Sequence, residues 1–251
     1  SIYIETAVET GAKIEVAKMM KSGIPKGQAL AIKQPFEFIQ IPLFNSIGGY
    51  KSYVYPVILI MILHQTMLFG LGLMQGTRNE RKEKYCEDSK DIPFNLFIRS
   101  SLYVILYLIY GVAAFLIFPS IFVYPAYYNV IPLFIIYTLM LYSAAFFAQT
   151  LSYCFRIREA VLMTMVVASI IFVFIPGLIW PREAMPMFIN LLSFFIPASC
   201  GVDAIIKLNQ NGAVFNNVFY DFLWLIFLNI FYFVTAVMLT KKSDIKKDEK
   251  I

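Results

Sequence analysis

The feature that most constrains this chain is a series of long apolar runs. A bilayer span needs about 20 predominantly apolar residues, and five segments reach that length: residues 53–75, 98–118, 130–153, 159–179 and 219–240. The chain is 59% hydrophobic and 15% charged, whereas soluble domains are typically about 25% charged. The sequence therefore predicts an integral membrane protein.

The runs are continuous, which distinguishes helices from the alternating segments of an outer-membrane barrel. Within lipid, every backbone polar group must be bonded internally, and helices achieve this within one segment. We therefore expect an all-α polytopic membrane protein with five transmembrane helices. Its transmembrane domain would cover residues 51–242, with a cytoplasmic tail at 243–251.

The basic residues fix the expected orientation, because cytoplasmic loops carry an excess of lysine and arginine. They gather in the loop after the first run (Arg78, Arg81, Lys82, Lys84 and Lys90), the loop after the third run (Arg156 and Arg158) and the tail (Lys241, Lys242, Lys246, Lys247 and Lys250). The loop between the second and third runs has none. We expect a multi-pass protein of the cell membrane with a cytoplasmic C-terminus.

Residues 1–50 then lie outside the cytoplasm. Apolar residues recur at helical spacing up to Gly23 and Pro25, which would end a helix, and "FEFIQIP" alternates like a strand. This segment is expected to be part of a small extracytoplasmic α/β domain. An export signal or an earlier span is expected before Ser1.

The polar residues within the apolar runs include His64, Gln65, Gln149 and Asn229. Such residues either belong to a functional site or bond to a neighbouring helix. The second interpretation is favoured, because a single histidine without an acidic partner makes a poor proton relay. The small-residue spacing of Gly70, Gly72 and Gly76 allows close helix approach.

Two loops each allow two structural interpretations. "TRNERKEKYCEDSK" after the first run is either a solvated loop or a short amphipathic helix that docks onto a cytoplasmic partner, with Lys82, Glu83 and Glu87 available for i,i+4 pairing. "FIPGLIWPREAMPMF" holds three prolines. It begins either a re-entrant helical hairpin over residues 181–208 or an outer-surface loop anchored by Trp180.

Together these segments resemble the type-2 ABC exporter permease family over residues 10–242. "TRNERKEKY" resembles the family's charged run, although Lys84–Tyr85 replaces its Gly-Thr end. "LFNSIGGYKSYVYP" resembles its entry motif, with Ser46 in place of proline. The matching positions are Asn45, Tyr50, Tyr53 and Pro56 in the entry motif, and Gly177, Pro181, Met185, Pro186, Leu192, Ser193 and Pro197 between the last two spans.

The resemblance implies roles and partners. Coupling to an ATP-binding cassette subunit would fall to Arg78, Glu80, Arg81, Lys82 and Glu83, and an extracytoplasmic re-entrant gate to Gly177, Pro181, Arg182, Glu183, Met185, Pro186 and Pro197. A second permease half would complete the pore, in a homodimer or a heterodimer, and a bacterial inner membrane is expected. The family's first helix and most of its outer domain would precede Ser1.

The chain contains no GxxxxGK[ST] motif, so ATP would be hydrolysed by the partner. This chain is therefore expected not to be an enzyme itself. It is also expected to bind no cofactor, metal or nucleic acid. The expected function is ATP-driven export of a hydrophobic or amphipathic substrate, with membrane lipid around the subunit. An ion-coupled secondary transporter is an alternative, but it would need carboxylates inside the spans. A membrane enzyme is another, but it would need a nucleophile and base within reach of each other.

Overall fold

A computed structural model describes residues 14, 17–23, 25, 50–121, 129–155, 157–175, 185–209 and 211–248. The chain divides into two units, Ser1–Leu43 and Phe44–Ile251. In the first unit, residues 17–21 are helical, and the turn after them includes Gly23 at a φ of 87°. The predicted α/β domain is not supported: it lies largely outside the described residues, and those described within it contain no strand.

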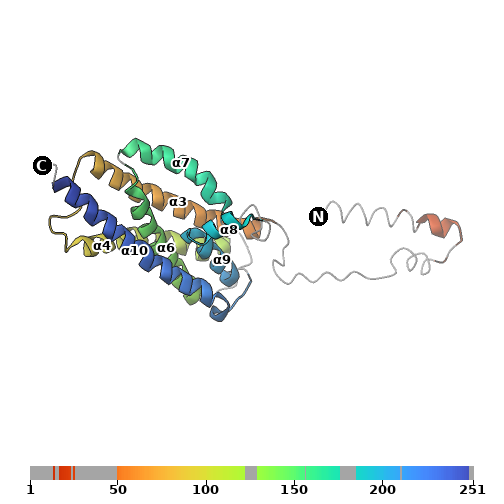
Figure 1. Cartoon of the computed structure of the whole chain (residues 1–251). Helices are drawn as coiled ribbons and strands as arrows, with labels where there is room; N and C mark the ends of the chain where they lie inside the picture. Colours follow the sequence, from red (N-terminus) through yellow and green to blue (C-terminus); the bar gives the residue numbers. More distant parts are fainter. Residues whose placement is uncertain are drawn as a thin grey trace. The chain divides into compact units, whose positions relative to one another are not determined.

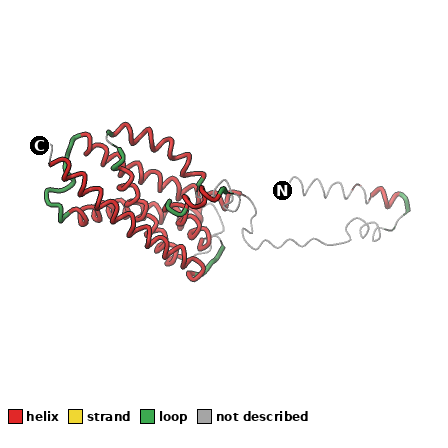
Figure 2. The backbone as a smooth tube through the Cα atoms, viewed as in Figure 1, coloured by secondary structure: helices red, strands yellow, loops and turns green. Residues whose placement is uncertain are grey.

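The second unit is a bundle of helices (Figures 1 and 2). In chain order its elements are α3 (Tyr50–Glu80), α4 (Ile92–Val112), the π-helix η1 (Ala113–Ile117), α5 (Phe118–Ile121), α6 (Val130–Ser152), α7 (Arg158–Phe174), α8 (Met187–Ser193), α9 (Pro197–Asn209), the 3₁₀-helix η3 (Phe215–Val218) and α10 (Phe219–Asp248). No strand occurs in the part of the chain that the structure describes. The expected all-α architecture is thus confirmed.

Four helical segments are long and apolar enough to cross a membrane: Val54–Glu80, Ile92–Ile121, Val130–Ser152 and Phe215–Ile245. They correspond to four of the five predicted spans. The fifth, α7, has 17 residues, at the lower limit of the roughly 17–25 residues of a spanning helix. The pair α8 and α9 is bent by 82°, where the sequence predicts a re-entrant hairpin.

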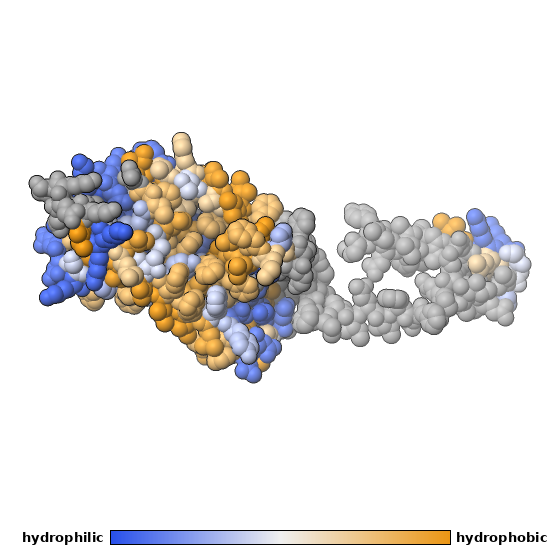
Figure 3. Space-filling model, in the orientation of Figure 1, coloured by the Kyte–Doolittle hydropathy of each residue, from blue (hydrophilic) through white to orange (hydrophobic). Residues whose placement is uncertain are grey.

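Helix α6 forms the centre of the bundle. It packs against α10, α3, α9 and α4, and side chains all around it are buried, including Leu133, Ile136, Tyr137, Met140 and Leu141. Helix α7 lies at the edge beside α3 (Figure 1). The outer surface of the bundle is hydrophobic along its middle, and hydrophilic residues gather at the end where α10 finishes (Figure 3).

Glycines set the closest helix contacts. A Cβ atom on Gly72 would lie 2.9 Å from Val161 Cγ1 of α7, and one on Gly76 would lie 3.0 Å from Val161 Cγ2. These two glycines therefore let α7 approach α3, as their spacing predicts. Gly70 instead faces the ring of Tyr103 on α4.

The tightest aromatic contact occurs at Gly111 near the end of α4. A Cβ atom there would lie 2.2 Å from Cε1 of Tyr137. That ring is fully buried on α6, and its hydroxyl donates to the Tyr107 carbonyl at 3.0 Å. Because the ring is held at its far end, it has little freedom to move aside.

We predict that Gly111→Ala lowers the free energy of unfolding by about 1–3 kcal/mol, the usual cost of overfilling a packed core. Thermal denaturation of the purified protein in detergent measures this. Ile109→Ala on the same helix is the control, because Ile109 is 63% exposed. Equal melting temperatures for Gly111→Ala and the unchanged protein would show that Tyr137 does not constrain α4.

Candidate functional site

The end of α3 places the predicted coupling residues. Glu83 N–H donates to the Arg78 carbonyl at 3.0 Å, and Lys82 N–H donates to the Asn79 carbonyl at 3.2 Å. Lys82 has a φ of 59°, so these bonds form a Schellman motif with a lysine at the left-handed position. The helix therefore ends in a defined turn rather than by fraying.

Residues 80–84, which we call the charged turn, present exposed side chains. Arg81 Nη1 lies 3.7 Å from Glu83 Oε1, and the two side chains are 68% and 52% exposed. Such an exposed ion pair contributes little to stability. The charged turn is thus a solvent-facing surface at a fixed helix end.

The separate amphipathic helix considered for this loop does not form. Helix α3 continues through Glu80, and residues 81–91 are turns and irregular backbone. Arg78 therefore lies on the last turn of α3 and is partly buried, while Glu80, Arg81, Lys82 and Glu83 are exposed.

The loop is fixed to the end of α10. The backbone N–H of Tyr85 donates to both carboxylate oxygens of Asp244, at 3.1 Å and 3.0 Å. Both residues are buried, with 7% and 5% of their surface exposed. A charge-assisted bond of this kind, shielded from water, is stronger than a neutral one and ties the loop to a distant helix.

Two arginines lie over the Tyr85 ring. The Cζ atom of Arg78 is 4.8 Å from the ring centroid, and that of Arg99 on α4 is 4.5 Å from it. Burial raises the pKa of the Tyr85 phenol, although both neighbouring guanidiniums act in the opposite direction. The phenol therefore stays neutral, and the contacts that join α3 and α4 to the loop are cation–π contacts.

The other two predicted cytoplasmic segments lie at the same end. Asn79 Nδ2 donates to the Phe155 carbonyl at 2.9 Å, which joins α3 to the loop after α6. The Tyr153 and Thr240 hydroxyls are 2.6 Å apart, which joins that loop to α10. We call this end of the bundle, formed by the loop after α3, the loop after α6 and the last turns of α10, the basic end.

In the half of the bundle away from the basic end, α8 and α9 meet at a break beside α10. Trp224 Nε1 donates to the Phe194 carbonyl at 2.7 Å, and Tyr232 Oη donates to the Phe195 carbonyl. Near the start of α10, Asp221 pairs with Lys207 at the end of α9. Asp221 and Tyr232 are about 17 Å apart along α10, at 1.5 Å per residue, so α9 runs antiparallel to α10 from the depth of the bundle to its end.

The predicted gate residues divide into two groups. Pro186 immediately precedes α8, and Pro197 is the first residue of α9, positions that suit a residue without an N–H. Met185 adjoins Pro186 and is half-buried. Gly177, Pro181, Arg182 and Glu183 lie outside the described residues.

The structure gives the polar residues of the spans different surroundings. Gln149 Nε2 donates to Ser100 Oγ on α4 at 2.7 Å, and Asn229 Nδ2 donates to the Leu139 carbonyl on α6 at 2.9 Å. His64 lies between the rings of Phe147 and Phe172. Among the described residues, neither its ring nitrogens nor the Gln65 amide has a hydrogen-bond partner.

No group of three or more histidine, cysteine or acidic residues suitable for a metal ion occurs in the described ranges. The arrangement as a whole is a membrane bundle with a charged turn at its basic end and a broken helix pair at the other.

A family model described as "ABC-2 family transporter protein" matches residues 2–238. The chain belongs to this family. It is therefore the permease of an ABC transporter, and the family implies association with an ATP-binding cassette subunit. Among curated proteins and among solved structures, none matches the chain.

The sequence pointed to the charged turn as the expected coupling segment. It did not reveal the three residues that hold this turn in place, which are Tyr85, Arg99 and Asp244. Arg99 is a lone cation inside an apolar run, and such residues commonly mark special sites. Tyr85 and Asp244 gave no such signal, because they are 159 residues apart in the chain.

We predict that Asp244→Ala lowers the free energy of unfolding of the ABC-2 permease by about 1–3 kcal/mol, because it leaves the buried Tyr85 N–H without an acceptor. Asp244→Asn, which keeps a carbonyl oxygen, would lose less. Thermal denaturation compares both with Lys241→Ala, an exposed position on the same helix. A loss no larger than that of Lys241→Ala would show that the loop is not held by this bond.

Proposed function

We propose that this permease serves an ATP-driven exporter that moves a hydrophobic or amphipathic substrate out of the cytoplasm or the inner leaflet. It would lie in the cell membrane, in a bacterial inner membrane, with the basic end and the C-terminus in the cytoplasm. ATP would be bound and hydrolysed by the cassette partner, since the chain has no phosphate-binding GxxxxGK[ST] motif. The excess of lysine and arginine at the basic end supports this orientation.

The observation that carries the proposal is the charged turn at a fixed helix end. Its five side chains, Glu80, Arg81, Lys82, Glu83 and Lys84, are exposed, while its backbone is held by the Schellman bonds and by the anchored Tyr85. A surface whose backbone is already held in place and whose side chains are charged suits docking onto a partner protein, because little conformational entropy is lost on binding. We assign the contact with the cassette subunit to this turn.

The same contacts provide a route for transmitting movement. A displacement of the charged turn acts on α10 through the Tyr85–Asp244 bond and on α4 through Arg99 and the Tyr85 ring. Helix α10 is 30 residues long, and its first half holds the α8–α9 break through Trp224 and Tyr232. We propose that closure of the ATPase moves the hairpin at the opposite end through α10.

The composition of the helices supports the proposed substrate class. The four long helices carry acidic residues only near their ends, so they lack the interior carboxylates that ion coupling usually uses. An apolar or amphipathic cargo would cross such helices without a counter-charge. A second permease half would complete the path, with the hairpin as an outer gate.

We predict that the double variant Arg81→Gln and Lys82→Gly removes ATP-driven transport without unfolding the permease. Glycine suits the left-handed position of Lys82, so the helix end is kept or slightly stabilised. The measurement is substrate-dependent ATP hydrolysis and efflux by the full-length complex in proteoliposomes. We expect at least about a tenfold loss, corresponding to about 1.4 kcal/mol of docking free energy.

Lys90→Gln is the matched control, because it removes an exposed cation from the same loop, six residues along the chain from the end of the charged turn. Unchanged transport by the double variant, with the cassette subunit still bound, would contradict the proposed docking role. Transport driven by an ion gradient without ATP would contradict the exporter itself.

A further inference from the structure

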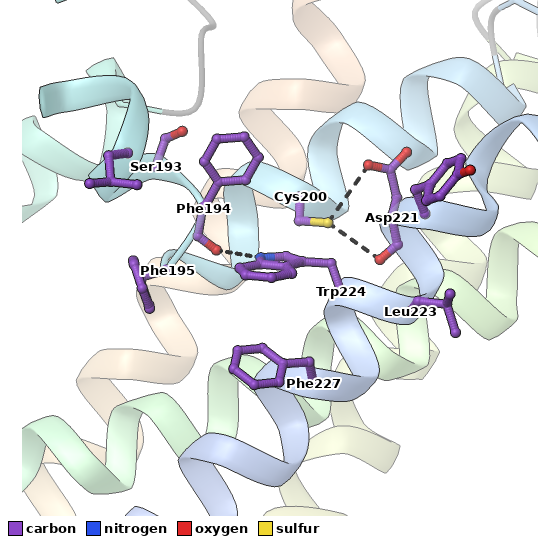
Figure 4. Close-up of a pocket in the computed structure, with 10 residues that line it drawn as sticks. Ser193, Phe194, Phe195, Cys200, Asp221, Leu223, Trp224 and Phe227 are labelled. Atoms are coloured by element: carbon purple, nitrogen blue, oxygen red, sulfur yellow. Dashed lines mark hydrogen bonds between the residues drawn. The ribbon is translucent and has the colours of Figure 1, made fainter. Parts of the chain in front are cut away.

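A cavity of about 670 Å³ lies between α8, α9 and α10, within the size range of ligand pockets. Its walls are apolar: Leu191, Phe194, Phe195, Leu223, Trp224 and Phe227 line most of it. Figure 4 shows Trp224 and Phe227 extending from α10 on one side, opposite the chain at the α8–α9 break. The cavity is therefore an open, aromatic groove along α10.

The groove has one charged end. Asp221 lines it, and Lys207 Nζ lies 2.8 Å from Asp221 Oδ2. The thiol of Cys200 points at the same residue, with Sγ 3.4 Å from the Asp221 carbonyl oxygen (Figure 4). Asp221 is in the first turn of α10 and Lys207 in the last turn of α9, so both helix dipoles favour these charges.

The Lys207–Asp221 ion pair can form further hydrogen bonds to a ligand. The Lys207 and Asp221 side chains are 41% and 20% exposed. An ammonium group has three donors and a carboxylate has about four acceptor positions, so one mutual bond leaves room for a ligand on each partner. Tyr220 and Trp224 lie close by in sequence on α10, and such amphipathic rings are typical of the headgroup level of a membrane.

A second groove provides a comparison. It has a volume of about 600 Å³ between α6 and α10, and its lining includes Ile131, Phe134, Ile135 and Ile226. Among the residues that the structure describes, no charged one lines it. An acyl chain fits the apolar lining of either groove, but of these two grooves it is the one lined by Asp221 that has an anion in its wall and a cation, Lys207, paired beside it.

We propose that the groove between α8, α9 and α10 binds a zwitterionic glycerophospholipid with a primary amine, that is, phosphatidylethanolamine. One acyl chain lies along Phe194, Trp224 and Phe227. The phosphate accepts a hydrogen bond from Lys207, and the ammonium group donates one to Asp221. This site does not depend on the direction of transport or on the docking of an ATPase.

The chemistry predicts a lipid preference. The quaternary amine of phosphatidylcholine has no N–H to donate to Asp221, and phosphatidylglycerol has no cation at all. Both should therefore bind more weakly than phosphatidylethanolamine.

The test is photo-crosslinking of the full-length protein in nanodiscs that contain phosphatidylethanolamine with a diazirine in its acyl chain, followed by peptide mapping. Competition with unlabelled phosphatidylethanolamine, phosphatidylcholine and phosphatidylglycerol measures the preference. Crosslinks are expected on α8 and the first half of α10. Lys207→Gln should weaken binding roughly two- to fivefold, as expected for a half-exposed charge contact, and Phe227→Ala about tenfold.

Two variants make the result specific. Lys207→Arg keeps the cation and should retain binding, which separates loss of charge from loss of fold. Ile226→Ala changes the neighbouring residue, which faces the second groove, and should leave binding unchanged. Equal competition by the three lipids, an equal loss in Ile226→Ala, or capture of a second protein copy in place of lipid by a photo-crosslinking amino acid placed at Phe227 would overturn the proposal.

Discussion

The structure depends on one constraint, namely that no backbone polar group inside an apolar environment can remain unbonded. Continuous helices meet it for α3, α4, α6 and α10. The break between α8 and α9 frees carbonyl groups within the bundle, and two aromatic side chains of α10 donate to them: Trp224 to Phe194 and Tyr232 to Phe195. The broken pair is thus possible because α10 supplies the missing donors.

Helix α10 therefore has two tasks. Its first half supports the helix break and lines the aromatic groove, and its last turns hold the loop after α3 through Asp244. The basic end and the opposite end are connected by one continuous helix rather than by a chain of separate side-chain contacts. Such an element could carry movement between an ATPase and the hairpin, provided that it has two discrete positions.

Much of the fold was predictable because the length of an apolar run and the position of a proline are local properties. The four long helices lie where the runs are, α8 starts directly after Pro186, and α9 starts at Pro197. The end of α3 was misplaced, because Gln75, Thr77 and Asn79 look like a loop but hydrogen-bond along the helix and to Phe155. The anchoring of Tyr85 by Asp244 could not be predicted, since no periodicity links residues so far apart in the chain.

The central claim is that the charged turn contacts the ATP-binding cassette subunit. Its most direct test places a photo-crosslinking amino acid at Lys82 and, separately, at Asn211, an exposed residue at the opposite end, in the full-length complex within native membranes. The account predicts a crosslink to the cassette subunit from position 82 and none from position 211. A crosslink from position 211, or none from position 82 in a complex that still co-purifies, would contradict it.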